Sequence, residues 1–269
     1  MPWRQTTESN LNMHIRLIFL FLLLACSNTY GQAVTPSGRI STTRTEFVNR
    51  AGNKTSLNGV QATGKLDTIP PCTILVVNHV TSRGVAPVAK TVTYNLAFST
   101  ITGTNKCWLT QNLGSTNPPT SATDNTEASA GWYWQFGNKK AYRFTTSRTP
   151  STAWPAQPQV NTDWAASQDP CTIELGTGWR LPTYAEWQAV ETAARNLNSV
   201  YASDLGMHAA GFLTTAGTLT ERGSTVHYWS SDSFSTTHAR AYVIPTLNGT
   251  STTSTNDKDA GFSVRCIRD

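Results

Sequence analysis

Five cysteines in this sequence could form disulfides or bind a metal ion: Cys26, Cys72, Cys107, Cys171 and Cys266. The last four are never two to four residues apart, and no histidine pair has ligand spacing, so a zinc site is not indicated. Without Cys26, which ends an apolar leader, an even number remains in what reads as an exported chain. This predicts two disulfides. Four cysteines allow three pairings, and spacing alone does not choose among them.

The histidines show no catalytic pattern. There is no HExxH motif and no serine partner at a recognisable spacing, so no hydrolase is implied and we expect no catalytic residue, metal site or cofactor. Each histidine is predicted to be a surface or core residue: His14, His79, His208, His227 and His238.

An aromatic block, GWYWQFG at residues 131–137, allows two interpretations. Trp132 and Trp134 could stack on sugar rings. The same alternation of side chains is also typical of a core strand beside a loop, which we favour. Both residues are retained as candidate ligand contacts.

The segment from Ser231 to Asp259 is rich in small polar residues and is expected to form loops. Binding surfaces are often carried by loops on a rigid scaffold, although a plain solvated loop is the alternative. The alternation His238-Ala239-Arg240-Ala241-Tyr242 would place three polar side chains on one strand face and two alanines on the other. The candidate ligand surface comprises Ser231, Asp232, His238, Arg240 and Tyr242.

Composition and charge limit the partners. The 269 residues include 21 Lys and Arg against 16 Asp and Glu, and only 14% are charged. The small basic excess is scattered, so we expect no nucleic-acid partner. A surface of uncharged polar residues is common outside the cell.

The N-terminus is predicted to be a secretory signal peptide, residues 1–31, with Met13 as an alternative start. Ten apolar residues, 17–26, follow His14 and Arg16, whereas a membrane-spanning helix needs about 20. No transmembrane segment is therefore expected. Ordinary cleavage would release a chain beginning at Gln32. Alternatively, residues 23–26 resemble a lipobox, which would lipidate Cys26 and anchor the protein. Either route predicts a secreted or outer-surface protein.

After the leader, the chain is expected to consist of two regions. Residues 32–69 read as a Thr/Ser-rich stalk or N-terminal strands, and Pro70-Pro71 marks the start of a domain spanning 70–269. Thr91 to Phe98 and Cys107 to Leu109 are predicted to form a hairpin. Further short strands are predicted at 226–230, 239–244 and 261–267. One main helix is predicted over 183–197, started by a Thr183/Glu186 capping box. Together these elements indicate an α+β domain.

Several strings together resemble one family, the Fibrobacter succinogenes major paralogous domain. They cover about Cys72 to Asp269: KCWLTQNLG (106–114), GWYWQFG (131–137), DPC followed by GWRLPTYAEW (169–187), YWSS (228–231) and GFSVRCIRD (261–269). Two of them also resemble the formylglycine-generating sulfatase-modifying family. The link from Cys171 to Gly178 is longer than is usual in the first family.

The resemblance implies a C-type-lectin-like fold with a small twisted antiparallel sheet and long loops. The four cysteines match positions that look like paired structural ones, and we predict the pairs Cys171–Cys266 and Cys72–Cys107. The motifs by which such lectins hold calcium are missing. Gln168-Asp169-Pro170 has the wrong order, and the residues after Trp229 lack the carboxylate pattern.

The leading functional hypothesis is an exported, non-catalytic binding or adhesion module for a surface protein or glycan. A second is a structural or assembly subunit joined to its neighbours through the stalk. A third is an enzyme of the formylglycine-generating type, which would require reactive thiolates.

Overall fold

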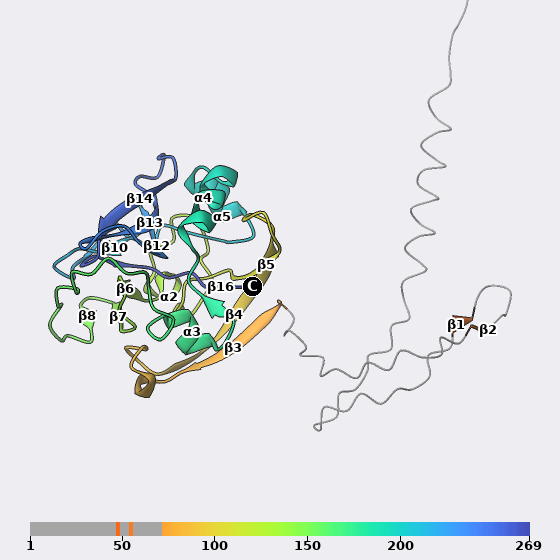
Figure 1. Ribbon diagram of the computed structural model, residues 1–269, viewed down its shortest axis with the longest axis horizontal. Helices are drawn as coiled ribbons and strands as arrows, with labels where there is room; N and C mark the ends of the chain where they lie inside the picture. The colour runs from red at the N-terminus through yellow and green to blue at the C-terminus, as the bar shows by residue number, and fades with distance from the viewer. Residues whose placement is uncertain (1–46, 49–53, 56–71) are drawn as a thin grey trace, which may run out of the picture. The chain divides into compact units, whose positions relative to one another are not determined.

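The computed structural model describes residues 47–48, 54–55 and 72–269 (Figure 1). The predicted signal peptide, both alternatives at Cys26 and most of the predicted stalk lie outside the described residues. Within the described ranges, no helix is long and apolar enough to cross a membrane.

The chain divides into two units, Met1–Asp67 and Thr68–Asp269. In the first, β1 (Phe47–Val48) pairs with β2 (Lys54–Thr55) in antiparallel register.

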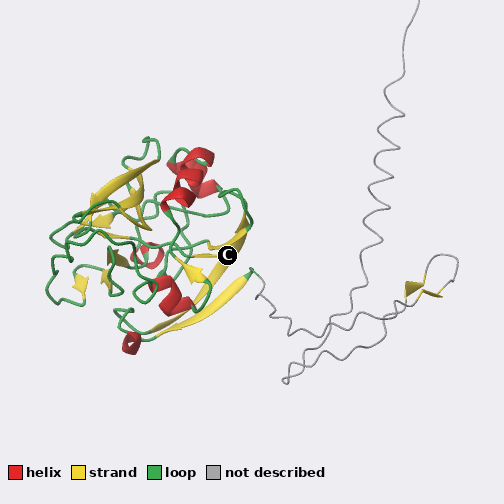
Figure 2. Cartoon of the chain, viewed as in Figure 1, coloured by secondary structure: helices red, strands yellow, loops and turns green. Residues whose placement is uncertain are grey.

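The second unit is α+β and dominated by antiparallel strands, as predicted (Figure 2). Where the sequence suggested one small sheet, residues 72–269 form three, with five, six and three strands.

The five-stranded sheet has the order β3-β4-β5-β16-β9. Its strands are β3 (Ile74–His79), β4 (Lys90–Ser99), β5 (Lys106–Leu109), β16 (Ile267–Arg268) and β9 (Trp179–Arg180). The predicted hairpin is confirmed, since β4 and β5 pair from Leu96↔Leu109 to Ser99↔Lys106.

The six-stranded sheet has the order β11-β10-β15-β6-β7-β8. Its strands are β11 (Leu219–Thr220), β10 (Phe212–Leu213), β15 (Gly261–Phe262), β6 (Tyr133–Gln135), β7 (Ala141–Phe144) and β8 (Arg148–Thr149). The strand predicted over 261–267 is therefore interrupted. The chain leaves this sheet after β15 and enters the five-stranded sheet as β16.

The three-stranded sheet is formed by β12 (Val226–Ser233), β13 (His238–Ile244) and β14 (Thr252–Asp257). The predicted strand over 239–244 is confirmed as β13, whereas β14, in the same segment from Ser231 to Asp259 that was expected to be loop, was not predicted. The polar sequence TTSTND of β14 carries no apolar alternation, and its pairing with β13 makes it a strand.

The helical elements are short. They are η1 (Thr81–Arg83), α2 (Glu127–Ala130), α3 (Pro170–Leu175), α4 (Tyr184–Ala193) and α5 (Leu197–Ala202). The Thr183/Glu186 capping box is confirmed.

The predicted end of the main helix is wrong. Ala194 leaves the helical conformation, with φ −139° and ψ 88°, so α4 stops before it. The side chain of Asn196 then accepts a hydrogen bond from the Ser199 amide and starts α5, a separate helix.

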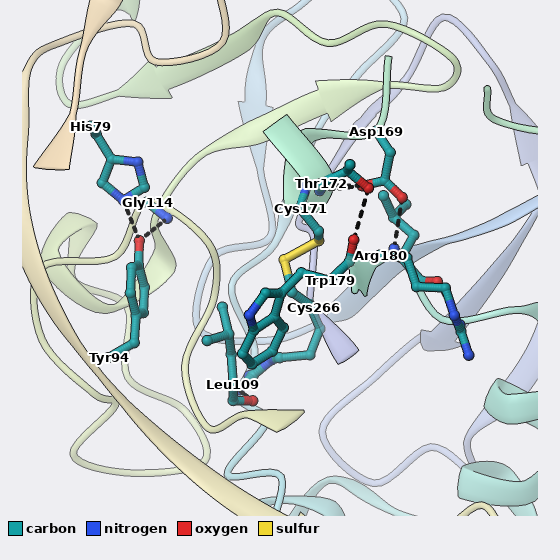
Figure 3. The surroundings of a disulfide bond; sticks show 12 residues. His79, Tyr94, Leu109, Gly114, Asp169, Cys171, Thr172, Trp179, Arg180 and Cys266 are labelled. Atoms are coloured by element: carbon teal, nitrogen blue, oxygen red, sulfur yellow. Dashed lines mark hydrogen bonds between the residues drawn. A yellow bond between two sulfur atoms is a disulfide. The ribbon is translucent and has the colours of Figure 1, made fainter. Parts of the chain in front are cut away.

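Both disulfides form as predicted. Cys72–Cys107 joins the residue just before β3 to β5, and Cys171–Cys266 joins α3 to the segment before β16 (Figure 3). Beside the second bridge, Asp169 caps α3 by accepting the amides of Cys171 and Thr172, and it also accepts the Leu181 amide. Burial raises the pKa of Asp169 to about 6.

Trp187 is central to the core under α4. Its ring stacks on Tyr242 at 5.1 Å and on Tyr228 at 5.8 Å between centroids, and its indole N–H donates to the Trp229 carbonyl at 3.1 Å. Like Trp108 and Trp179, it is buried, as predicted.

We expect Trp187→Ala to lower the free energy of unfolding by about 3 to 5 kcal/mol, because it removes a fully buried aromatic side chain. Thr183→Ala should cost only about 1 kcal/mol, the usual value for a lost helix cap. Chemical denaturation of both variants measures the two values. The reverse ranking would contradict this account of α4.

Candidate functional site

Helix α4 covers only part of the outer face of β13. His238, Arg240 and Tyr242 share this face, while Ala239 and Ala241 are buried on the other, so the predicted alternation is confirmed. Tyr242 lies under Trp187 of α4. Arg240, two residues earlier in the strand, lies beside Tyr184, the first residue of α4, and is half-buried.

The prediction that Tyr242 belongs to an exposed surface is wrong. Its side chain is fully buried, and its hydroxyl donates to the Ala194 carbonyl at 3.3 Å. Burial raises its pKa well above the ordinary tyrosine value. Tyr242 is therefore a core residue.

The guanidinium of Arg240 is in contact with two aromatic rings. Its central carbon is 4.4 Å from the ring centroid of Tyr184 and 4.3 Å from that of Phe234. Such cation–π contacts hold a flexible side chain in one orientation. Within the described residues, Arg240 makes no side-chain hydrogen bond and no ion pair. Its N–H donors are therefore available to an external group.

We define the Arg240 platform as Tyr184, Phe234, His238, Arg240 and Thr255. Thr255 lies directly opposite Arg240 on β14. Phe234 is 50% exposed, which is unusual for a large apolar side chain in this domain.

The turn that carries Phe234 is tightly hydrogen-bonded. The amides of Phe234 and Ser235 both donate to the His238 carbonyl, at 3.0 and 2.9 Å. The His238 amide donates back to the Ser235 hydroxyl at 3.0 Å. The position of the Phe234 ring is thus set by its own turn.

Lys258 stabilises this turn through hydrogen bonds. It is only 2% exposed, and its ammonium donates to the carbonyls of Val160 and Ser235 and to the Ser233 hydroxyl, at 2.6, 2.8 and 2.8 Å. Burial lowers its pKa. Sequence reasoning missed Lys258, because in the run Asp257-Lys258-Asp259 it looks like an exposed turn residue.

Ser231 and Asp232 have a positioning role. The Asp232 carboxylate accepts the Tyr184 amide at 2.7 Å and the Ser231 hydroxyl at 3.1 Å. The Ser231 amide donates to the Pro182 carbonyl. These contacts fix the start of α4, and with it Tyr184, against β12.

Trp132 and Trp134 do not belong to the surface. Both are fully buried, and Trp134 donates its indole N–H to the Lys139 carbonyl at 3.1 Å. Of the two interpretations of the aromatic block, core packing is correct, and their candidacy as ligand contacts is wrong.

A second polar constellation, unforeseen from the sequence, lies in the core. His79 Nδ1 is 2.6 Å from Glu174 Oε2. His79 Nε2 is 2.8 Å from the Tyr94 hydroxyl, which accepts the Gly114 amide (Figure 3). These contacts are satisfied together when Nδ1 donates to the carboxylate and Nε2 accepts from the tyrosine. Burial raises the pKa of Tyr94.

That constellation resembles a catalytic relay in its order of groups. However, the side chains of His79, Glu174 and Tyr94 are all fully buried. It therefore ties α3 to the β3–β4 hairpin and has no contact with solvent.

Two further histidines are buried without ion-pair partners. Burial lowers the pKa of His208 to about 3 and that of His227 to about 4, so both are neutral at pH 7. His238, in contrast, is half-buried on the platform, and its Nδ1 lies 2.7 Å from the Thr237 hydroxyl.

In the part of the chain that the structure describes, no group of three or more His, Cys, Asp or Glu side chains is placed to hold a metal ion. Cys72, Cys107, Cys171 and Cys266 are all disulfide-bonded.

Comparisons of the chain with protein-family models, curated proteins and solved structures find no match.

We expect Lys258→Met to lower the free energy of unfolding by about 2 to 3 kcal/mol and to speed amide exchange in residues 233–238. The substitution removes the buried ammonium that donates hydrogen bonds to Val160, Ser233 and Ser235. Denaturation and hydrogen-exchange mass spectrometry measure both effects. Lys139→Met is the matched control and should change stability by less than about 0.5 kcal/mol. Equal effects of the two variants would contradict the role given to Lys258.

Proposed function

We propose that this protein is an exported, non-catalytic binding or adhesion module with a C-type-lectin-like scaffold, and that its ligand contacts the Arg240 platform. The observation that carries the proposal is the state of Arg240. Its guanidinium contacts the rings of Tyr184 and Phe234, yet its donors make no hydrogen bond within the described residues.

The composition of the platform supports a binding role. Arginine and aromatic side chains are enriched among the residues that dominate binding energy. An exposed ring such as Phe234 gains most from being covered. The platform is also rigid before any ligand arrives, since Lys258 holds its turn and Asp232 holds the start of α4. Prior ordering lowers the entropy cost of binding.

An extracellular location is compatible with the two disulfides, which persist in oxidising compartments. The predicted leader and the family resemblance support the same location. Whether the chain is released or anchored through Cys26 does not alter the platform.

A second candidate function, an assembly subunit, is favoured by the outer edge of β3. The Leu96 amide donates to the Thr73 carbonyl, so by strand alternation the backbone groups of Leu75 and Val77 face β4, and those of Ile74 and Val76 face outward. Among the described strands, none pairs with this edge.

The side chains on this edge are apolar and exposed. Ile74 is 59% exposed and Val76 is 63% exposed. Open apolar edges readily pair with another strand, and proteins usually protect them with charges or a cover. A second copy of this chain, pairing through the same edge, would protect it.

We expect Arg240→Ala and Phe234→Ala to weaken ligand binding by about 1 kcal/mol or more each, as is usual for hot-spot residues. The measurement is a glycan-array and surface-protein screen with the full chain expressed with its own leader, followed by titration of each hit. Arg195→Ala is the control, because Arg195 is exposed at the far end of α4. If all three variants bind like the unaltered chain, the platform is not the binding site.

For the assembly function, we expect the unaltered chain to form dimers or larger species as its concentration rises, and Val76→Lys to stay monomeric. A lysine on an open edge adds charge repulsion between paired strands. Sedimentation velocity over a concentration series measures this. Thr93→Lys is the matched control on the neighbouring strand. A monomer at every concentration would exclude assembly through this edge.

A further inference from the structure

The geometry around Arg240 restricts how a ligand can approach. The guanidinium is planar, with five N–H donors directed outward in its plane. Its central carbon lies 4.4 Å from the ring centroid of Tyr184 and 4.3 Å from that of Phe234. A hydrogen-bonding partner meets the donors along the edge of the group. Two parallel hydrogen bonds to one oxyanion fit an arginine approached in this way.

The positive charge of Arg240 is not neutralised by its surroundings. Three carboxylates lie near the platform. Asp232 accepts the Tyr184 amide at 2.7 Å, Asp257 accepts the Asp259 amide at 2.9 Å, and Asp163 accepts the Ser233 amide at 2.9 Å. Within the described residues, none of them forms an ion pair with Arg240. A ligand carboxylate would supply the missing counter-charge.

The groups beside Arg240 suit a sugar ring. Phe234 offers an exposed aromatic surface, on which the C–H face of a pyranose can pack. Thr255 and His238 carry hydrogen-bonding groups on the same sheet face as Arg240. Binding sites of this kind combine an apolar surface with a few polar groups that fix orientation.

An acidic peptide can present the same carboxylate, so it is a competing ligand in the test. The exposed ring of Phe234 beside Arg240 favours the saccharide, because the C–H face of a pyranose packs flat on such a ring.

We infer that the Arg240 platform binds an acidic saccharide by its carboxylate, with a hexuronic acid residue as the recognised unit. Arg240 pairs with the carboxylate and Phe234 packs on the ring. The inference rests on the proposed function and names the ligand class of the same site.

The test uses pairs of oligosaccharides that differ only in charge. Oligomers of galacturonic, glucuronic and mannuronic acid are titrated against the full chain, each beside its methyl ester. A sulfated neutral oligosaccharide and a glutamate-rich peptide form two further arms. We expect at least one acid to bind at least tenfold more tightly than its ester, with affinity falling as salt rises.

The variants separate geometry from charge. Arg240→Lys keeps the positive charge but loses the planar fork, so it should weaken binding of the acid at least tenfold, and Arg240→Gln should weaken it further. Arg195→Gln should bind like the unaltered chain. Melting temperatures of all three should stay within a few degrees of that chain, because none of these side chains is buried in the core.

The outcomes are distinguishable. Equal binding of acid and ester, or unchanged binding by Arg240→Gln, overturns the inference while leaving a binding module in place. Preference for the sulfated oligosaccharide or the peptide overturns the assignment of a uronic carboxylate. Binding to none of these probes overturns the inference, and if the wider screen also finds no ligand, the proposed function fails as well.

Discussion

Helix α4 packs across the three-stranded sheet, and the position of this helix determines which residues of the sheet are exposed. Trp187 stacks on both Tyr228 and Tyr242, so the helix cannot shift along the sheet without losing buried aromatic contacts. Further along the helix, Glu191 accepts both the amide and the hydroxyl of Thr253 on β14, each at 2.8 Å. The helix therefore lies at one fixed position. Where it begins decides which part of β13 faces solvent, and this places Arg240 at the boundary.

Local signals in the sequence identified the elements that are determined locally. The start of α4 depends on Thr183 and Glu186, three residues apart, and it was predictable. Its end was not, because the carbonyl of Ala194 accepts hydrogen bonds from Tyr242 and Ser251. Those partners come from a sheet much later in the chain. An uninterrupted helical pattern gives no sign of such contacts.

In the candidate site, too, the features set by local sequence were predictable and those set by distant contacts were not. The alternation along β13 correctly placed His238, Arg240 and Tyr242 on one face, but only the position of α4 reveals that Tyr242 is covered. Tyr184 and Phe234 were not singled out, since their role arises from contact with an arginine that is distant from Tyr184 in sequence. The pairing of the cysteines, by contrast, followed from the family resemblance and is what the structure shows.

The two disulfides also determine how the domain would carry mechanical load. Consider tension between the residues before Cys72 and the C-terminal residue, Asp269. The force enters the fold at Cys72 and passes directly through the covalent bridge to Cys107 in β5. The β3–β4 hairpin lies inside the loop that this bridge closes, so it is not stretched. The Cys171–Cys266 bridge shields α4 and the Arg240 platform in the same way. Between the two bridges, only the chain from Trp108 to Pro170 can lengthen under tension, while the three-stranded sheet lies inside the loop that the second bridge closes.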